Sequence, residues 1–396
     1  MPLLELYNKS GELKLWLDTI MDSNFVIDSS GYVETWKDLS DYENNFTQTN
    51  SGNRPGLVGD AVNGYSAVRF DGSNDYLTPG WGTKDINMSN PFAIFVVGRF
   101  LSADSGPLFS AYNITLSFLA YNHYAFQVWG HQPGSITAIR QGDIANQRWL
   151  MGVGTGSERQ GTKYSYSFYL NGEDLVDEAQ RLGSYTSSGL GASNYWAVGG
   201  GPAWGHYVHS DIVEVIMINR EISTLERVSI MRYLSDKWGL NNDMDSDGDG
   251  ILDSDEGMSP SLSGDMSKVI VSENTVTDQK IDVIEKIITL EDVDSNSSDI
   301  SLTADSNNRS LIKGTDVTFL SIGNNQFKLQ LQIPANTHGE STVLIYAEDE
   351  SGNVDVISFE VEVNQVDQDG DGVSDHSDSF PEDSSQYLKV PNILFR

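Results

Sequence analysis

The chain has 396 residues and 38% hydrophobic content, which suggests two or three domains with packed cores. Its formal net charge is -33, and residues 241–396 carry 32 Asp and Glu against 8 Lys and Arg. That excess argues against a nucleic-acid partner and favours divalent cations. The absence of cysteine excludes a disulfide-stapled scaffold, and no apolar run reaches the roughly 18 residues that a membrane-spanning helix needs.

Residues from about Leu13 to Leu240 predict a large β domain. Phe92–Phe100 is almost wholly apolar or β-branched, and His209–Arg220 is a second strong strand. Within Ser165–Val176, two strands flank Asn171-Gly172, a pair suited to the positive φ angles of a two-residue turn. Many such strands predict an all-β fold, a two-sheet jelly-roll sandwich.

One helix is expected after these strands. Ser223-Thr224-Leu225-Glu226 is a capping box, in which the Ser hydroxyl and the Glu carboxylate each accept a backbone N–H. Leu225, Val228, Met231 and Leu234 then recur at helical spacing, with Arg227 and Arg232 off this stripe. Gly239 is the expected C-cap.

Residues from about Ser267 to Asn364 contain short alternating strands and predict a smaller, immunoglobulin-like sandwich. The expected domains are residues 1–240, a linker at 241–266, the smaller sandwich at 267–364, a second linker at 365–384, and a further module or tail at 385–396.

An acidic segment occurs twice, once in each linker. Each copy has Asp at positions 1, 3 and 5, Gly at 6, and acids at 9 and 12, which is the twelve-residue calcium-loop spacing. The predicted ligands, with position 7 offering its carbonyl, are Asp245, Asp247, Asp249, Ile251, Asp253 and Glu256 in the first copy. They are Asp367, Asp369, Asp371, Val373, Asp375 and Asp378 in the second.

Calcium takes six to eight hard oxygen ligands, which alternate residues of a tight turn can supply. A disordered acidic linker is the alternative, but the spacing, the glycines and the repetition favour calcium. A sensor EF-hand is disfavoured because neither copy lies between two helices. The segment "DQDGDGVSDHSDSFP" resembles the thrombospondin type 3 repeat, whose segments wrap around calcium.

The large domain also carries a resemblance. The blocks "LKLWLD", "VETWKDLS", "NGYSAVRFDGSNDYL" and the region from Asp211 to Leu240 resemble the laminin-G-like, concanavalin A-like family of bacterial surface proteins. That resemblance implies a jelly roll that binds glycans or other surface ligands. "IPANTHGESTVLIYAEDESGN" resembles the cadherin-like or immunoglobulin-like repeats of large bacterial adhesins.

Glycoside hydrolases of this fold place two glutamates on one strand as an acid/base pair. The nearest match, Asp211-Ile212-Val213-Glu214, has one glutamate, so we expect no enzyme activity. Aromatic and polar side chains near two glycine-containing segments are the candidate ligand-binding residues. They are Trp129, Trp204, His206 and Tyr207.

The sequence therefore predicts a calcium-dependent adhesin fragment, extracellular or at the cell surface. It would bind carbohydrate or a cell-surface glycan through the jelly roll, without nucleic acid and without membrane insertion, as a monomeric piece of a larger protein. The alternative is a non-catalytic carbohydrate-binding region of a secreted polysaccharide-degrading enzyme.

Overall fold

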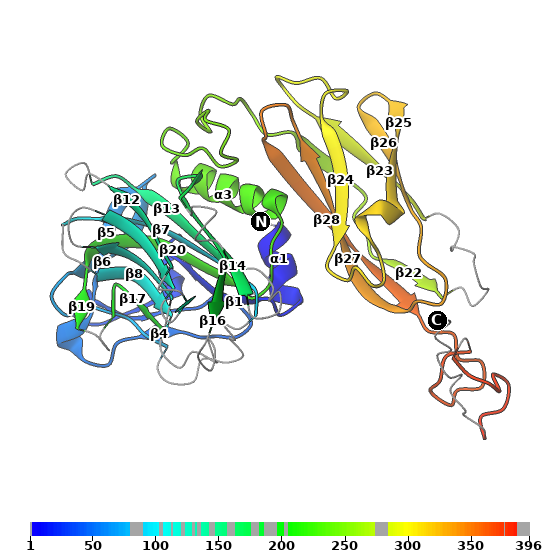
Figure 1. The fold of residues 1–396 in the computed structure, drawn as a ribbon, viewed down its shortest axis with the longest axis horizontal. Coiled ribbons are helices and arrows are strands. Elements are labelled where there is room, and N and C mark those ends of the chain that lie inside the picture. The colour runs from blue at the N-terminus through cyan, green and yellow to red at the C-terminus, as the bar shows by residue number, and fades with distance from the viewer. Residues whose placement is uncertain are drawn as a thin grey trace. The chain divides into compact units, whose positions relative to one another are not determined.

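A computed structural model of the chain describes residues 2–79, 90–102, 106–111, 114–119, 123–128, 131–132, 136–141, 147–156, 163–175, 182–185, 196–201, 205–273, 284–375 and 377–385. Strands hold 46% of the residues and helices 11%, which confirms the all-β prediction. The chain divides into two compact units, Leu3–Asp255 and Glu256–Arg396 (Figure 1).

The first unit is built around a ten-stranded sheet, in which strands β13, β7, β20 and β6 are neighbours. Both strong runs seen in the sequence lie in its middle, as β7 (Phe92–Phe100) and β20 (His209–Ile218). Its other strands are β1 (Leu13–Asp18), β5 (Gly56–Val62), β6 (Tyr65–Asp71), β11 (His131–Gln132), β13 (Leu150–Gly156), β14 (Lys163–Leu170), β15 (Glu173–Asp174) and β16 (Leu182–Tyr185).

A five-stranded sheet completes the sandwich. It consists of β8 (Gly106–Ala111), β9 (Ile114–Leu119), β10 (His123–Val128), β12 (Ile136–Gln141) and β17 (Trp196–Val198). Smaller sheets are formed by β2 (Phe25–Ile27), β3 (Val33–Trp36) and β4 (Phe46–Thr47), and by β18 (Gly200–Gly201) and β19 (His206–Tyr207). The core contains Ile94 and Val96 of β7 together with Phe109 and Trp196, whose rings meet edge to face at 5.4 Å. Both sheets therefore contribute to one core.

Among the described residues of this unit, the α-helices are α1 (Pro2–Lys9) and α3 (Thr224–Trp238). The predicted capping box is confirmed: the Glu226 N–H donates to Ser223 Oγ at 3.2 Å, and the Ser223 N–H donates to Glu226 Oε2 at 2.7 Å. Gly239 ends the helix with φ 65°, as expected of a C-cap. Tyr7 of α1 donates its hydroxyl to Glu226 Oε1 at 2.7 Å, which links the two helices.

The second unit is a sandwich of two four-stranded sheets. One contains β21 (Ser261–Gly264), β23 (Ile284–Glu291), β25 (Val317–Gly323) and β26 (Gln326–Leu331). The other contains β22 (Val269–Ser272), β24 (Ser301–Ser306), β27 (Gly339–Glu348) and β28 (Val354–Asn364). Residues 261–264 were expected to be linker, but they form the edge strand β21, because their backbone pairs with residues 288–291 of β23.

Two acidic loops as candidate metal sites

The first acidic loop has an internal frame of backbone-to-carboxylate hydrogen bonds. Asp245 accepts the Gly248 N–H at 2.8 Å and the Gly250 N–H at 3.0 Å. Asp247 accepts the N–H of Asp249 at 3.1 Å. Asp249 accepts the N–H of Ile251 at 2.7 Å. Each carboxylate is thereby held on the inner side of a tight turn, with φ 98° at Gly250.

The second loop repeats this frame at every equivalent position. Asp367 accepts the Gly370 and Gly372 N–H groups at 2.8 and 2.9 Å. Asp369 accepts the Asp371 N–H at 3.2 Å, and Asp371 accepts the Val373 N–H at 2.8 Å. Two segments with the same Asp spacing therefore fold into the same turn.

Both frames bring carboxylate oxygens together. One oxygen from each of Asp245, Asp247, Asp249 and Glu256 lies within 4.8 Å of the others, and so do oxygens of Asp367, Asp369 and Asp371. Ligands at 2.3–2.6 Å from one calcium ion lie at most about 5 Å apart, so both clusters fit a single ion of this size. The predicted carbonyl ligands at Ile251 and Val373 stay predictions.

The second loop also contains oxygens that lack partners. Asp378, at position 12, is buried, and its Oδ1 accepts the Phe380 N–H at 2.9 Å. Within the part of the chain that the structure describes, no group donates to its Oδ2 or to the Oδ2 atoms of Asp369 and Asp371. Buried polar atoms without partners are rare in folded proteins, and a bound cation would satisfy them.

The acids at position 9 do not join the clusters. Asp253 is buried, with its Oδ1 2.7 Å from Arg232 Nη1 and 2.8 Å from the Ser246 N–H, and its Oδ2 accepts the Ser246 hydroxyl at 2.8 Å. Asp375 Oδ1 accepts the Gln368 N–H at 2.8 Å. These two predicted ligands instead tie the end of each loop back to its beginning.

The electrostatics of the two loops agree. Burial raises the pKa of Asp247, and the charges of Asp249 and Asp245 raise it further, against a hydrogen bond from the Asp249 N–H that lowers it. At the equivalent Asp369, burial and the charges of Asp371, Asp378 and Asp367 raise the pKa in the same way. Negative charge thus accumulates in both loops, and a divalent cation would reverse its effect on the pKa.

No sequence pattern indicates which segments support the first loop. The Asn171-Gly172 hairpin turn lies against it: the Asp245 N–H donates to Asn171 O at 3.2 Å, and Asn171 Nδ2 donates to Asp243 O at 3.1 Å. Arg227 of α3 donates to Ser246 O at 3.0 Å and lies over the Tyr169 ring. The hairpin turn and helix α3 therefore both hold the first loop through hydrogen bonds to its beginning.

Glu273 supports the second loop in a similar way. It is buried, its Oε1 accepts the Ser374 hydroxyl at 2.6 Å and the Val366 N–H at 2.9 Å, and its Oε2 lies 3.0 Å from His338 Nδ1. Burial works to raise the pKa of Glu273, but these hydrogen bonds outweigh it and hold the pKa below its usual value. A lone glutamate at a strand end offered no signal for this role.

Of the candidate ligand-binding residues, Trp129 and Trp204 lie outside the described residues. His206 and Tyr207 form β19; His206 is exposed, and Tyr207 is half-buried with its ring 6.3 Å from that of Tyr76. Because they are consecutive residues of a strand, their side chains point to opposite faces of β19.

Asp211 and Glu214, the acids of the nearest match to the hydrolase pattern, are both buried on β20. Asp211 is paired with Arg69 and Arg99. Glu214 accepts the indole N–H of Trp16 at 2.8 Å, the indole N–H of Trp238 at 2.7 Å and Lys237 Nζ at 2.7 Å. Each carboxylate is thus occupied by cationic or N–H partners.

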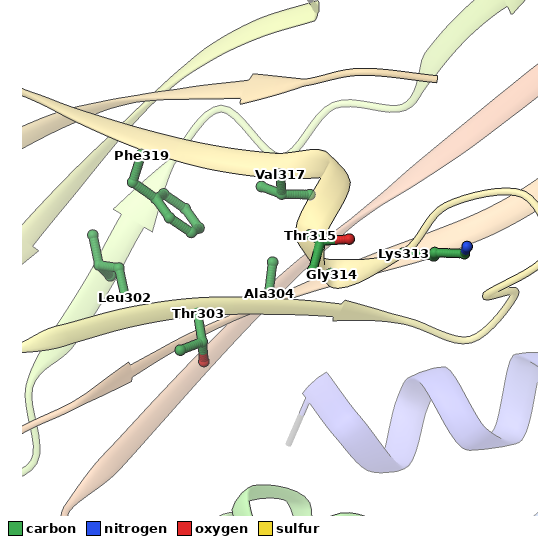
Figure 2. Close-up of a pocket in the computed structure, with 8 residues that line it drawn as sticks. All are labelled: Leu302, Thr303, Ala304, Lys313, Gly314, Thr315, Val317 and Phe319. Carbon is green, nitrogen blue, oxygen red and sulfur yellow. The ribbon is translucent and has the colours of Figure 1, made fainter. Parts of the chain in front are cut away.

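The second unit has a cavity of about 450 Å³ beside β24 and the turn Gly314–Asp316. Figure 2 shows Leu302 and Ala304 of β24 facing Val317 and Phe319 of β25 across it, with Lys313 at its edge. Its lining is mainly apolar and belongs to the space between two edge strands.

The chain has only distant similarity to known proteins. No family model and no curated protein matches the chain. Among solved structures, a Trypanosoma rangeli sialidase in complex with sialic acid has a TM-score of 0.39 at 14% identity, covering 57% of this chain and 33% of that one. This chain thus spans about a third of the sialidase.

Two toxin domains cover more of the chain. The binding domain of Paraclostridial Mosquitocidal Protein 1 has a TM-score of 0.40 at 13% identity, covering 86% of this chain and 78% of that one. The receptor-binding domain of botulinum neurotoxin D has a TM-score of 0.39 at 9% identity, covering 87% and 74%. At these scores no function is carried over. Among the described residues, no helix has the length and apolar character needed to cross a bilayer.

Proposed function

We propose that the chain is a calcium-dependent binding protein that works outside the cell, with the jelly roll binding carbohydrate or another surface ligand. The observation that carries the calcium proposal is the repeated frame of the two acidic loops. In each loop, the clustered carboxylate oxygens lie within 4.8 Å of one another, so a single ion could contact all of them.

Calcium is the ion that this chemistry favours. Every clustered group is a carboxylate, and hard oxygen ligands suit calcium or magnesium better than softer metals. Magnesium keeps several waters and rarely uses a cage of this many carboxylates, whereas calcium accepts flexible oxygen shells. Millimolar calcium, as found outside cells, would fill even weak sites of this kind. On this proposal the loops become ordered where calcium is abundant.

The proposed ligand surface of the jelly roll includes His206 and Tyr207. Tyr207 supplies an aromatic ring that can stack on a sugar, and His206 supplies an exposed polar group that can bind a hydroxyl. Binding without hydrolysis is the proposed activity, and the occupied state of Asp211 and Glu214 supports it, because neither is free to act as a general acid or base.

Calorimetry with two variants tests the calcium proposal. Asp245, Asp247 and Asp249 are replaced together by Asn in one variant, and Asp367, Asp369 and Asp371 in the other. Each variant should lose one calcium site and keep the other, so each is the control for its partner. The jelly roll should stay folded by circular dichroism. Calcium uptake equal to that of the unaltered chain in both variants would refute the proposal.

A polysaccharide and glycan screen of the full chain, with calcium and with chelator, tests ligand binding. We expect binding to at least one glycan, and a weaker signal in Tyr207→Ala at unchanged thermal stability. A chain that binds no glycan under either condition would contradict the carbohydrate proposal while leaving the calcium result intact.

A further inference from the structure

Four side chains form a row across the large sheet of the first unit. Asp211 of β20 lies opposite Arg69 of β6 on one side and Arg99 of β7 on the other. The guanidinium of Arg99 lies over the Trp149 ring, 4.8 Å from its centroid. The strands that carry this row are neighbours in Figure 1.

This row faces away from the core. Side chains alternate along a strand, and the sequence neighbours Phe70, Phe100 and Ile212 all belong to the core cluster. Arg69 and Arg99 therefore project to the other face. The exposed fractions of their side chains are 37% and 20%, whereas Asp211 is fully buried.

Both arginines bind the same carboxylate, and each leaves its Nη1 edge available for another acceptor. Arg69 uses Nε and Nη2 for Asp211, at 2.7 and 2.8 Å, and Arg99 uses the same two atoms at 2.9 and 2.7 Å. Among the residues that the structure describes, neither Nη1 has a partner. Two positive charges against one negative charge leave the row net positive, in a chain whose net charge is -33.

A structural ion pair would need only one arginine to neutralise Asp211. The second creates a fixed pair of guanidinium groups, held in place before any ligand arrives, so little side-chain entropy remains to be lost on binding. Guanidinium groups bind carboxylate and sulfate groups through parallel N–H donors. Trp149 is half-buried, and its ring lies against the Arg99 guanidinium, which helps to hold that group in place.

We propose that this row, Arg69–Asp211–Arg99–Trp149, is a subsite for the acidic group of an anionic polysaccharide, a carboxylate or a sulfate. The inference rests on the proposed carbohydrate binding and names its ligand class. The nearest carboxylate along β6, Asp71, accepts the N–H groups of Ser73 and Asn74 and so is engaged in its own turn. Repulsion from distant acids is screened beyond about 8 Å at physiological ionic strength.

The test compares three polymers on the full chain: polygalacturonate, dextran sulfate and neutral dextran. We expect an acidic polymer to bind more tightly than dextran, and Arg69→Gln to weaken that binding about tenfold, the loss of one charge-assisted contact. Arg69→Lys, which keeps the charge but not the fork, should weaken it several-fold. Preference for one acidic polymer tells carboxylate from sulfate.

Arg309→Gln is the matched control. Arg309 makes the same two-pronged contact to a carboxylate, Asp305, but lies in the other unit. Its loss should change affinity less than twofold. Equal weakening in both Gln variants, or wild-type binding no stronger for acidic polymers than for dextran, would overturn the inference.

The two proposals fail in different ways. Binding to neutral glycans that Arg69→Gln leaves intact would sink the subsite but not the carbohydrate proposal, whereas a chain that binds no polysaccharide would sink both. Arg99 still pairs Asp211 in the Arg69 variants, so they should fold; circular dichroism checks this. If Arg69→Gln fails to fold, Arg69→Lys carries the test, and unchanged affinity in that folded variant overturns the subsite.

Discussion

Arg232 of α3 and Asp253 of the first acidic loop form a buried ion pair, with Arg232 Nη1 2.7 Å from Asp253 Oδ1. The second loop has Asp375 at the same place, and its Oδ1 accepts only the backbone N–H of Gln368 among the contacts that the structure describes. The inner frames of the two loops are alike, but their outer supports differ.

Arg232→Gln should weaken calcium binding at the first loop alone. The change leaves Asp253 buried without its cation, and breaking a buried pair in this way costs about 3–5 kcal/mol. The free energy of unfolding, from urea titration in chelator, should fall by a cost of that order. Calorimetry should then show one weakened site and one unchanged site. Equal weakening of both sites would contradict a local role for Arg232.

Gly172→Ala should dislodge the first loop from the hairpin. A Cβ at Gly172 would lie 1.4 Å from the carbonyl oxygen of Asp245. Gly64 is the matched control, since it follows Asn63 in a similar turn with φ 80° but has nothing within 4 Å. Gly64→Ala should cost about 1–2 kcal/mol, the strain of the left-handed backbone alone. We expect Gly172→Ala to lower the free energy of unfolding by at least about 1–3 kcal/mol more, because the new Cβ overpacks the site. Denaturant titration measures the free energy of unfolding of both variants. Equal losses would refute the steric argument.

Glu214→Ala should strongly destabilise the first unit. Lys237 and the indole N–H groups of Trp16 and Trp238 would each lose a buried acceptor. An expected loss of about 3–5 kcal/mol follows from uncovering a buried charge. Glu221→Ala, at an exposed glutamate just before the same helix, should stay within about 0.5 kcal/mol of the unaltered chain. A comparable stability for the two variants would argue against the network.

Asp75 should make stability depend on pH. Burial, followed by the charge of Asp71, raises the pKa of Asp75 to about 6. The folded chain therefore favours protonated Asp75, and this preference stabilises the fold. The stabilisation is complete below the unfolded pKa of about 3.9 and is lost as pH rises through the folded pKa.

Asp75→Asn removes that titration. In chelator, the variant should exceed the unaltered chain in stability by roughly 1 kcal/mol near pH 7.5, discounted for solvent screening, and match it near pH 4. Urea midpoints across this range measure the difference. A stability difference that does not change with pH would show that Asp75 is not the titrating group.

Features with short sequence separation were predictable. The Ser223–Glu226 capping box and the Asn171-Gly172 turn have their donors and acceptors within a few residues, so residue type and spacing determine them. The frames of both acidic loops are equally local, since every bond in them spans at most five residues.

The contacts of the acids at position 9 could not be predicted from their spacing. Asp253 carries the residue type and spacing of a ligand, yet it turns to Arg232, because α3 lies beside the loop in the folded chain. Arg232 itself lies off the apolar stripe of its helix, and no periodicity indicates that a second segment buries that face.

By itself, the sequence determined the all-β class, the helix with both its caps, and two acidic turns with their carboxylates facing inward. Only the tertiary structure decided which distant side chains meet, such as Arg69 and Asp211, 142 residues apart, and Arg99 and Asp211, 112 apart. The physical reason is that the alternation of apolar and polar residues along a strand indicates which face is buried. It does not indicate which other strand pairs with it. That choice depends on the register of β6, β20 and β7, which the packing of the whole core sets.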